Sequence, residues 1–260
     1  MIGLVTKRKM TSTRIIARMD IKGPNLIKGI RFEGVRVIGD PQKYAEKYYN
    51  DGIDEIIYID TVASLYDRIS LHDLVEKTAN NVFIPITVGG GVRSVENVKR
   101  LLRAGADKIA INTAAVKRPE LIREVAHRFG SQCMVLSIEA CKQSSGKWEA
   151  YTDNGREHSD LEVISWAKQG AAFGAGEILL TSVDRDGTCK GFDIDLVKEV
   201  SEAVSIPVIA SGGMGKPDDF IHVVKKAKAD AVAIAHILHY NKYSILEIRN
   251  NAFQQGIHIR

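Results

Sequence analysis

The sequence is poor in the features that mark secreted, membrane-bound and zinc-binding proteins. It has 3 cysteines among 260 residues, Cys133, Cys141 and Cys189, without a Cys-x-x-Cys pair, so neither a disulfide framework nor a zinc site is expected. The longest apolar runs, such as Ile206 to Ala210, are far shorter than the roughly 20 residues of a membrane-spanning helix. The basic residues 7–9 precede no apolar stretch of signal-peptide length. We therefore expect a cytoplasmic protein without membrane contact.

No part of the chain concentrates charge of one sign. The net charge is +4, and the basic residues are spread among acidic ones. Nucleic-acid-binding segments instead gather Lys and Arg in a block or on one face, so no nucleic-acid partner is expected. The small positive balance suits phosphorylated small molecules. No pattern indicates a metal or an organic cofactor.

What the chain does have is enough apolar sequence for one large core, with 45% hydrophobic and 26% charged residues. Residues 1–9 are predicted to be an extension outside the fold, and residues 10–260 a single domain. Short β-rich runs alternate with amphipathic segments such as residues 95–104, a pattern typical of βα units and a parallel sheet. We predict an α/β fold of the (β/α)8 barrel type, because eight runs can be counted: Arg14 to Asp20, Glu55 to Asp60, Ile84 to Val88, Lys108 to Asn112, Met134 to Glu139, Glu177 to Ser182, Pro207 to Ser211 and Ala231 to Ala235.

The second half of the chain repeats the first. IDEIIYID from Ile53 matches AGEILLTS from Ala175, and IPITVGGG from Ile84 matches IPVIASGG from Ile206, at an offset of 122 residues. An internal repeat of this kind predicts a barrel made of two similar halves of four βα units each. Two similar ligand sites are therefore expected.

Two acidic residues close equivalent strands of the two halves. Asp20 ends the first predicted strand and Glu139 the fifth. The active site of a (β/α)8 barrel lies at the carboxyl ends of its strands, so the two carboxylates are expected to face each other across the barrel mouth. That placement suits general acid and base catalysis. The alternative for each carboxylate is a structural role as a helix cap or ion-pair partner.

Glycine-rich turns follow strands in both halves, where backbone N–H groups can approach an anion. A single such turn is equally explained by a tight connection, but two turns in equivalent places favour a substrate with a phosphate at each end. The candidate phosphate-binding residues are Gly90, Gly91, Asn112 and Thr113 in the first half, and Thr181, Asp186, Gly187, Gly212, Gly213, Ala235 and His236 in the second.

Lys28 lies in the long segment after the first strand. This segment is too long for a plain connection and is predicted to fold as a lid. Lys28 is expected either to close over a phosphate or to be solvated.

Five stretches together give the chain a family resemblance over about Arg14 to Arg260. They are TVGGGVRS from Thr87, GADKIAINTAAV from Gly105, FGSQ from Phe129, GAGEILLTSVDRDGT from Gly174 and IPVIASGG from Ile206. The chain resembles the cyclase subunit of imidazole glycerol phosphate synthase in histidine biosynthesis. The resemblance implies a doubly phosphorylated substrate, phosphoribulosyl-formimino-aminoimidazole carboxamide ribonucleotide, and ammonia supplied by a glutaminase partner. It also implies that Asp20 and Glu139 share the acid–base steps.

The resemblance further implies a ring of charged residues at the opposite, amino-terminal face of the barrel, through which ammonia enters. Arg14, Glu55, Lys108 and Glu177 match that ring. Such charges can equally be structural, because residues at the amino-terminal face of a barrel commonly serve its stability.

Three residues at the active end depart from the family pattern. Arg18 replaces a small thiol, Glu139 replaces Asp, and His236 replaces Ser. Arg18 shares the face of Asp20, so it is expected to pair with Asp20 or Glu139 and lower a carboxylate pKa, or to contact an anionic ligand. The departures leave an alternative open: a barrel that no longer cyclises and delivers ammonia to an enzyme that amidinates a surface-polysaccharide sugar. An isomerase with two carboxylates is a third hypothesis, which the GAGEILLTSVDRDGT match disfavours.

Overall fold

Eight parallel strands close into a barrel in the computed structural model, which describes residues 12–63 and 71–260. The strands follow the order β1, β4, β5, β6, β7, β10, β11 and β12, and β12 pairs with β1. The predicted (β/α)8 barrel is confirmed. The barrel strands are β1 (Arg14–Lys22), β4 (Glu55–Asp60), β5 (Ile86–Gly89), β6 (Lys108–Ile111), β7 (Met134–Lys142), β10 (Glu177–Ser182), β11 (Val208–Ser211) and β12 (Ala231–Ile234).

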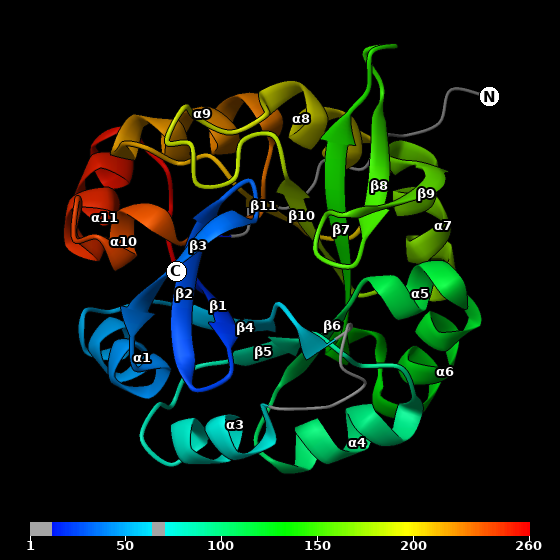
Figure 1. Cartoon of the computed structure of the whole chain (residues 1–260). Coiled ribbons are helices and arrows are strands. Elements are labelled where there is room, and N and C mark those ends of the chain that lie inside the picture. The colour runs from blue at the N-terminus through cyan, green and yellow to red at the C-terminus, as the bar shows by residue number, and fades with distance from the viewer. Residues whose placement is uncertain (1–11, 64–70) are drawn as a thin grey trace.

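Helices surround the strands as an outer ring (Figure 1). The amphipathic segment predicted at residues 95–104 is α4, which begins after Ser94, whose hydroxyl accepts from the Asn97 N–H as an N-cap. The described helices are α1 (Pro41–Asn50), α3 (His72–Ala79), α4 (Val95–Arg103), α5 (Thr113–Lys117), α6 (Glu120–Phe129), α7 (Val163–Phe173), α8 (Ile194–Ala203), α9 (Pro217–Ala227), α10 (His236–His239) and α11 (Ile245–Gln254), with a 3-10 turn at Ser131–Cys133.

The strands separate two apolar clusters. Strand side chains point alternately to the barrel axis and to the helices. Ile16, Ile57, Leu179 and Ile209 belong to the smaller cluster inside the barrel, whereas the larger cluster packs between strands and helices. Since Ile16 points inward, the same alternation turns Arg14, Arg18 and Asp20 of β1 toward the barrel axis. The polar groups of the site are thus carried on the same strand faces that fill the barrel.

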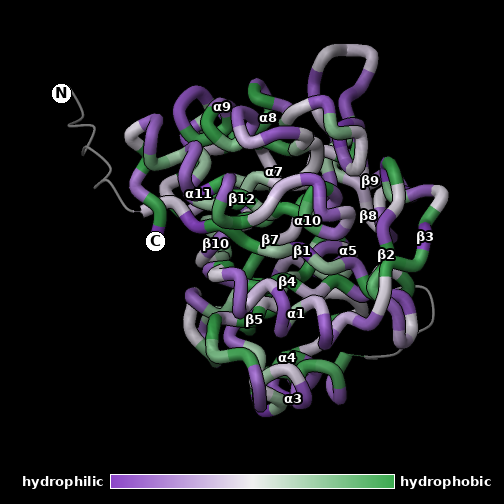
Figure 2. The backbone as a smooth tube through the Cα atoms, turned by 90° about the vertical axis from the view of Figure 1, so that its left-hand side faces the viewer, coloured by the Kyte–Doolittle hydropathy of each residue, from purple (hydrophilic) through white to green (hydrophobic). Residues whose placement is uncertain are grey.

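A β-hairpin follows the first strand of each half. β2 (Asn25–Ile30) pairs with β1 and with β3 (Glu33–Gly39), and β8 (Trp148–Thr152) pairs with β7 and with β9 (Glu157–Glu162). Figure 2 shows both hairpins on one side of the barrel, with the C-terminus on the other. The predicted half-barrel repeat therefore extends to these insertions.

The hairpins correct two predicted strand ends. The expected strands stop at Asp20 and Glu139, but β1 continues to Lys22 and β7 to Lys142. The physical reason is antiparallel pairing, since Asp20 lies opposite Ile27 and Glu139 opposite Tyr151. The other predicted ends either coincide with the observed ones, as in β4 and β10, or differ by one or two residues, as expected where strand pairing fades.

The predicted extension, residues 1–9, lies outside the described residues. In the described ranges, no helix combines the length and the apolar character that crossing a membrane requires. The three cysteines are free thiols of intermediate exposure.

Candidate active site

Asp20 and Glu139 lie on opposite sides of the barrel mouth. Asp20 comes from β1 and Glu139 from β7, and three strands separate these two in either direction around the barrel. Both carboxylates are buried, with 4% and 7% of each residue exposed. The structure thus places the two predicted catalytic residues across from each other, as the repeat requires.

Asp20 is held by two cations. Arg18 Nε donates to Oδ1 at 3.0 Å, and Lys28 Nζ lies 3.1 Å from Oδ2. Lys28 also contacts Asp186, at 2.8 Å. The segment predicted to fold as a lid is therefore a β-hairpin that carries Lys28 into a buried ion-pair network. The expectation of a solvated Lys28 is wrong, because two carboxylates surround its amine in place of water.

The two carboxylates differ in proton affinity. Burial by itself raises the pKa of Asp20, but the charges of Arg18 and Lys28 outweigh it and hold that pKa well below its usual range. Burial raises the pKa of Glu139 to about 7, opposed only in part by Arg18 and by the Gly155 N–H, which donates to Glu139 Oε2 at 2.7 Å. At neutral pH Asp20 is an anion, while Glu139 exists in both protonation states.

The Arg18 side chain crosses the barrel interior near the mouth. Its Nη1 donates to Thr181 Oγ1 at 2.7 Å and to Ser211 Oγ at 3.1 Å, and the Phe32 ring lies 5.4 Å from its guanidinium carbon. Of the two partners expected for Arg18, the structure shows Asp20. Thr181, predicted to bind phosphate, is engaged by this guanidinium.

An open cavity lies in the first half of the mouth. Its volume is about 460 Å³, and Glu139 forms part of its wall. All four predicted phosphate-binding residues of this half, Gly90, Gly91, Asn112 and Thr113, line the cavity. The other polar and charged lining residues are Asp60, Thr61, Arg93, Lys117, Arg118, Ser137 and Asn154.

The corresponding cavity in the second half, which we call the second-half cradle, is nearly filled. It encloses about 20 Å³, roughly enough for one water molecule. One reason for the difference is that the side chains of Arg18 and Lys28 occupy the space. A second is that the Arg31 N–H donates to the Asp186 carbonyl at 2.9 Å, which holds the β2–β3 hairpin against the second half of the mouth. The two expected sites thus differ in open volume. The predicted residues that line this cradle are Lys28, Asp186, Gly187, Gly212, Gly213, Ala235 and His236.

The glycine-rich turns have the same packing in both halves. Gly90 and Gly212 have φ of +99° and +90°, in the left-handed region that favours glycine. A Cβ at Gly90 would lie 2.8 Å from the Asp60 backbone nitrogen, and one at Gly212 would lie 2.7 Å from the Ser182 carbonyl oxygen. Close contact with the end of the neighbouring strand, β4 for Gly90 and β10 for Gly212, therefore explains these two glycines, whether or not an anion binds the turns.

The four predicted ring residues form a closed circuit of ion pairs at the strand starts. Arg14 contacts Glu55 at 2.9 Å and also pairs with Glu177, and Lys108 lies 3.0 Å from both carboxylates. Each cation is thus shared by two anions and each anion by two cations. Arg260 adds a longer contact to Glu55, at 3.7 Å.

The chain matches the model of a family described as "Histidine biosynthesis protein" over residues 14–244. It belongs to this family. A relative in Legionella pneumophila, named imidazole glycerol phosphate synthase subunit HisF, is 64% identical over 211 residues, covering 81% of this chain and 100% of the relative. A relative in Methanopyrus kandleri with the same name is 47% identical over 265 residues, covering 95% of this chain and 97% of the relative. The family match includes every predicted site residue.

Sequence reasoning missed several charged residues of the first-half cavity. Arg93 lies two residues after Gly91, and Lys117 and Arg118 follow the TAAV segment at the end of α5. Their position in the sequence could have identified them, because residues next to a predicted phosphate-binding turn lie within reach of the same anion. Lys117 has no ion-pair partner in the described parts of the chain, whereas Arg118 pairs with Glu124 at 2.6 Å.

The two histidines of α10 have different surroundings. His236 lines the second-half cradle, and its Nδ1 is buried without a hydrogen-bond partner in the described structure. His239 is buried, and its Nδ1 lies 2.7 Å from the Tyr48 hydroxyl. Burial, aided by the Lys28 charge, lowers the pKa of His239 to about 3, so it is a neutral core residue.

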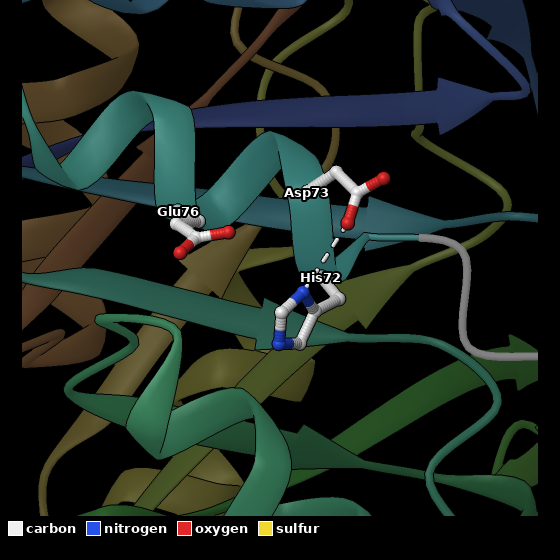
Figure 3. A group of neighbouring side chains, drawn as sticks. All are labelled: His72, Asp73 and Glu76. Atoms are coloured by element: carbon white, nitrogen blue, oxygen red, sulfur yellow. Dashed lines mark hydrogen bonds and ion pairs between the residues drawn. The ribbon is translucent and has the colours of Figure 1, made fainter.

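One group within the described residues has the spacing of metal ligands, and it lies outside the barrel mouth. His72, Asp73 and Glu76 of α3 offer ligand atoms within 4.8 Å of one another (Figure 3). The His72 ring already contacts Asp73 at 3.3 Å, and both carboxylates are exposed. The group is explained as a solvated helix start.

Proposed function

We propose that this chain is the cyclase subunit of imidazole glycerol phosphate synthase. In the proposed reaction, ammonia attacks the ketone of the phosphoribulosyl substrate, and acid–base steps then release aminoimidazole carboxamide ribonucleotide and close the imidazole ring. The observation that carries the proposal is the pairing of two opposed carboxylates at one end of the barrel with a closed ring of alternating charges at the other. The names of the relatives support the same assignment.

Asp20 and Glu139 are the proposed acid–base groups. Proton transfer at neutral pH needs a group with a pKa near the working pH, and Glu139, with a pKa of about 7, meets this condition. Its place in the wall of the 460 Å³ cavity gives it access to a bound substrate.

The two glycine-rich regions are the proposed sites for the two phosphates. The first-half cavity has room for one end of the substrate, and Lys117 is one of its lining residues. The second-half cradle needs its side chains to move apart before a phosphate can enter. Lys28 and the hairpin that carries it are the parts that would move, because they close this cradle.

The charged ring is the proposed entrance for ammonia. The two cations of the ring keep part of their side chains exposed, 14% for Arg14 and 18% for Lys108. In the proposed route they move aside from Glu55 and Glu177, so that the ring opens without unfolding the barrel. A glutaminase subunit docked at this face would deliver ammonia into the barrel. The location of the proposed complex is the cytoplasm.

Turnover of the phosphoribulosyl substrate with excess ammonium salt at pH about 8.5 tests the proposal. At this pH a useful fraction of ammonium is free ammonia, so no partner is required. Product formation is expected, and Glu139→Gln is expected to lose at least about a hundredfold in kcat. The matched control is Glu157→Gln, an exposed residue of β9, which should keep wild-type turnover.

Absence of turnover by the folded wild-type protein would contradict the cyclase proposal. That result would favour the ammonia-delivering subunit, and the search would turn to a glutaminase and a sugar-amidinating enzyme that accept this chain.

A further inference from the structure

Both oxygens of Asp20 are engaged by protein cations. Oδ1 accepts from Arg18 and Oδ2 from Lys28, and both partners are almost fully buried. If one of these two contacts breaks, a buried cation is left without its hydrogen-bond acceptor and the carboxylate keeps a single partner, which is costly in a buried network. Asp20 is therefore poorly placed to exchange protons with a substrate unless one of these contacts breaks.

Glu139 has one oxygen available. Oε2 accepts from the Gly155 N–H at 2.7 Å, whereas Oε1 has no hydrogen-bond partner within residues 12–63 and 71–260. Glu139 lines the open cavity, and Asp20 does not. The two predicted catalytic residues are thus equivalent in the repeat but unequal in access.

Arg18 is the residue that breaks the equivalence. It has no counterpart on β7, where position 137 is Ser137. Its guanidinium fixes Asp20 through Nε and is itself fixed by Thr181 and Ser211 of the opposite half. With 3% of the residue exposed, Arg18 cannot leave without a rearrangement of the barrel mouth.

We propose that Arg18 is a positioning residue that divides the acid–base work: it holds Asp20 as a fixed anion and leaves Glu139, through Oε1, as the carboxyl that exchanges protons with the substrate. The assignment rests on the proposed cyclase function. In it, Glu139 loses one proton to the substrate and regains one within the same turnover, so no net proton is consumed by the enzyme.

The charges around Glu139 set the sign of the expected effect. Arg18 and Asp20 face it from β1, and Asp153 faces it from the turn between β8 and β9. Arg18 lowers the pKa of Glu139, and the two acidic residues raise it. The same cavity also receives charged side chains from other elements, namely Asp60, Arg93, Lys117 and Arg118.

Titration of the side-chain carboxyl carbons by 13C NMR tests the assignment without any substrate. Asp20→Asn and Glu139→Gln identify the two signals. In the wild-type protein, Asp20 is expected to stay ionised from pH 4 to 8, while Glu139 titrates within this range. Arg18→Met should move the Glu139 midpoint upward by about 1 pH unit, and Arg18→Lys should restore most of it because the charge remains.

Lys22→Met is the matched control, since Lys22 lies on the same strand but is exposed at the start of the hairpin. It should leave both midpoints unchanged. An unmoved Glu139 midpoint in Arg18→Met would overturn the proposal. So would a wild-type protein in which Asp20 titrates between pH 4 and 8 and Glu139 does not, a result that needs no variant of Arg18.

Activity separates this assignment from the cyclase proposal. If the wild-type protein turns over, the acidic limb of its kcat/KM profile should move upward in Arg18→Met together with the Glu139 midpoint. A role of Arg18 in packing alone would lower activity without moving that limb. If no protein turns over, the cyclase proposal fails, and the titration still decides which carboxyl exchanges protons.

Discussion

Arg18 and Asp20 lie two residues apart on the inward face of β1, and the Arg18 guanidinium donates to the Asp20 carboxylate at 3.0 Å. The alternation of strand side chains makes this contact possible, and the low dielectric around two buried groups makes it strong. Arg18 is therefore part of the proposed catalytic end. It also helps to close one of the two proposed phosphate sites, since it lines that cradle.

Glu139→Gln should stabilise the protein at alkaline pH. The pKa of Glu139 is raised from 4.5 to about 7, so the folded state binds this proton more tightly than the unfolded chain. The free energy of unfolding then falls as pH rises from about 4.5 to 7. Removing the carboxyl should add up to roughly 3 kcal/mol at pH 8 and little at pH 4, as measured by urea unfolding.

The exposed Glu157→Gln variant should show no such pH-dependent gain. Equal stability of wild type and Glu139→Gln at pH 8 would mean that Glu139 is ionised at no cost, and the proposed proton affinity would be wrong.

Lys108→Met should disturb the ring at the amino-terminal face. Glu55 and Glu177 would then share Arg14, with only the longer Arg260 contact to Glu55 beside it, which leaves two close carboxylates short of positive charge. We expect the ratio of glutamine-driven to ammonium-driven turnover to fall at least about tenfold, because in the proposed route ammonia from the glutaminase passes through this ring. We also expect the free energy of unfolding to drop by about 2 kcal/mol.

Lys228→Met breaks an ion pair of comparable length, 2.9 Å to Glu202, on the outer surface. It should leave the turnover ratio unchanged and cost at most about 1 kcal/mol. A ratio that is the same in Lys108→Met and wild type would remove the ring from the ammonia route.

Lys117→Met should weaken substrate binding. Lys117 lines the open cavity and pairs with no carboxylate of the described chain, so its amine is available to a phosphate. We expect KM to rise about tenfold, which corresponds to about 1.4 kcal/mol, with kcat changed by less than about threefold, since the interaction is the same before and during the chemical step. Steady-state kinetics in ammonium salt measures both.

Lys225→Met, an exposed position of α9, controls for the loss of one positive charge. A KM for Lys117→Met within twofold of this control would place the phosphate elsewhere.

The sequence by itself determined the barrel, its halves and the residues at its two ends. The reason is local and periodic: inward and outward positions alternate along each strand, and strands of a parallel barrel all end at the same face. Knowing that Asp20 and Glu139 fall at equivalent places was therefore enough to set them opposite each other. The ring of four charged residues at the strand starts was predicted from the family resemblance.

Only the tertiary structure decided which contacts the site residues make. The hairpin after β1 folds back locally onto that strand and brings Lys28 to Asp20, but only contacts across the barrel, about which no local pattern informs, bring Lys28 to Asp186. The same packing fills one cradle and leaves the other open. Because proton affinities depend on burial and on neighbours distant in the chain, the inequality of Asp20 and Glu139 was decided by the fold, while their presence was decided by the sequence.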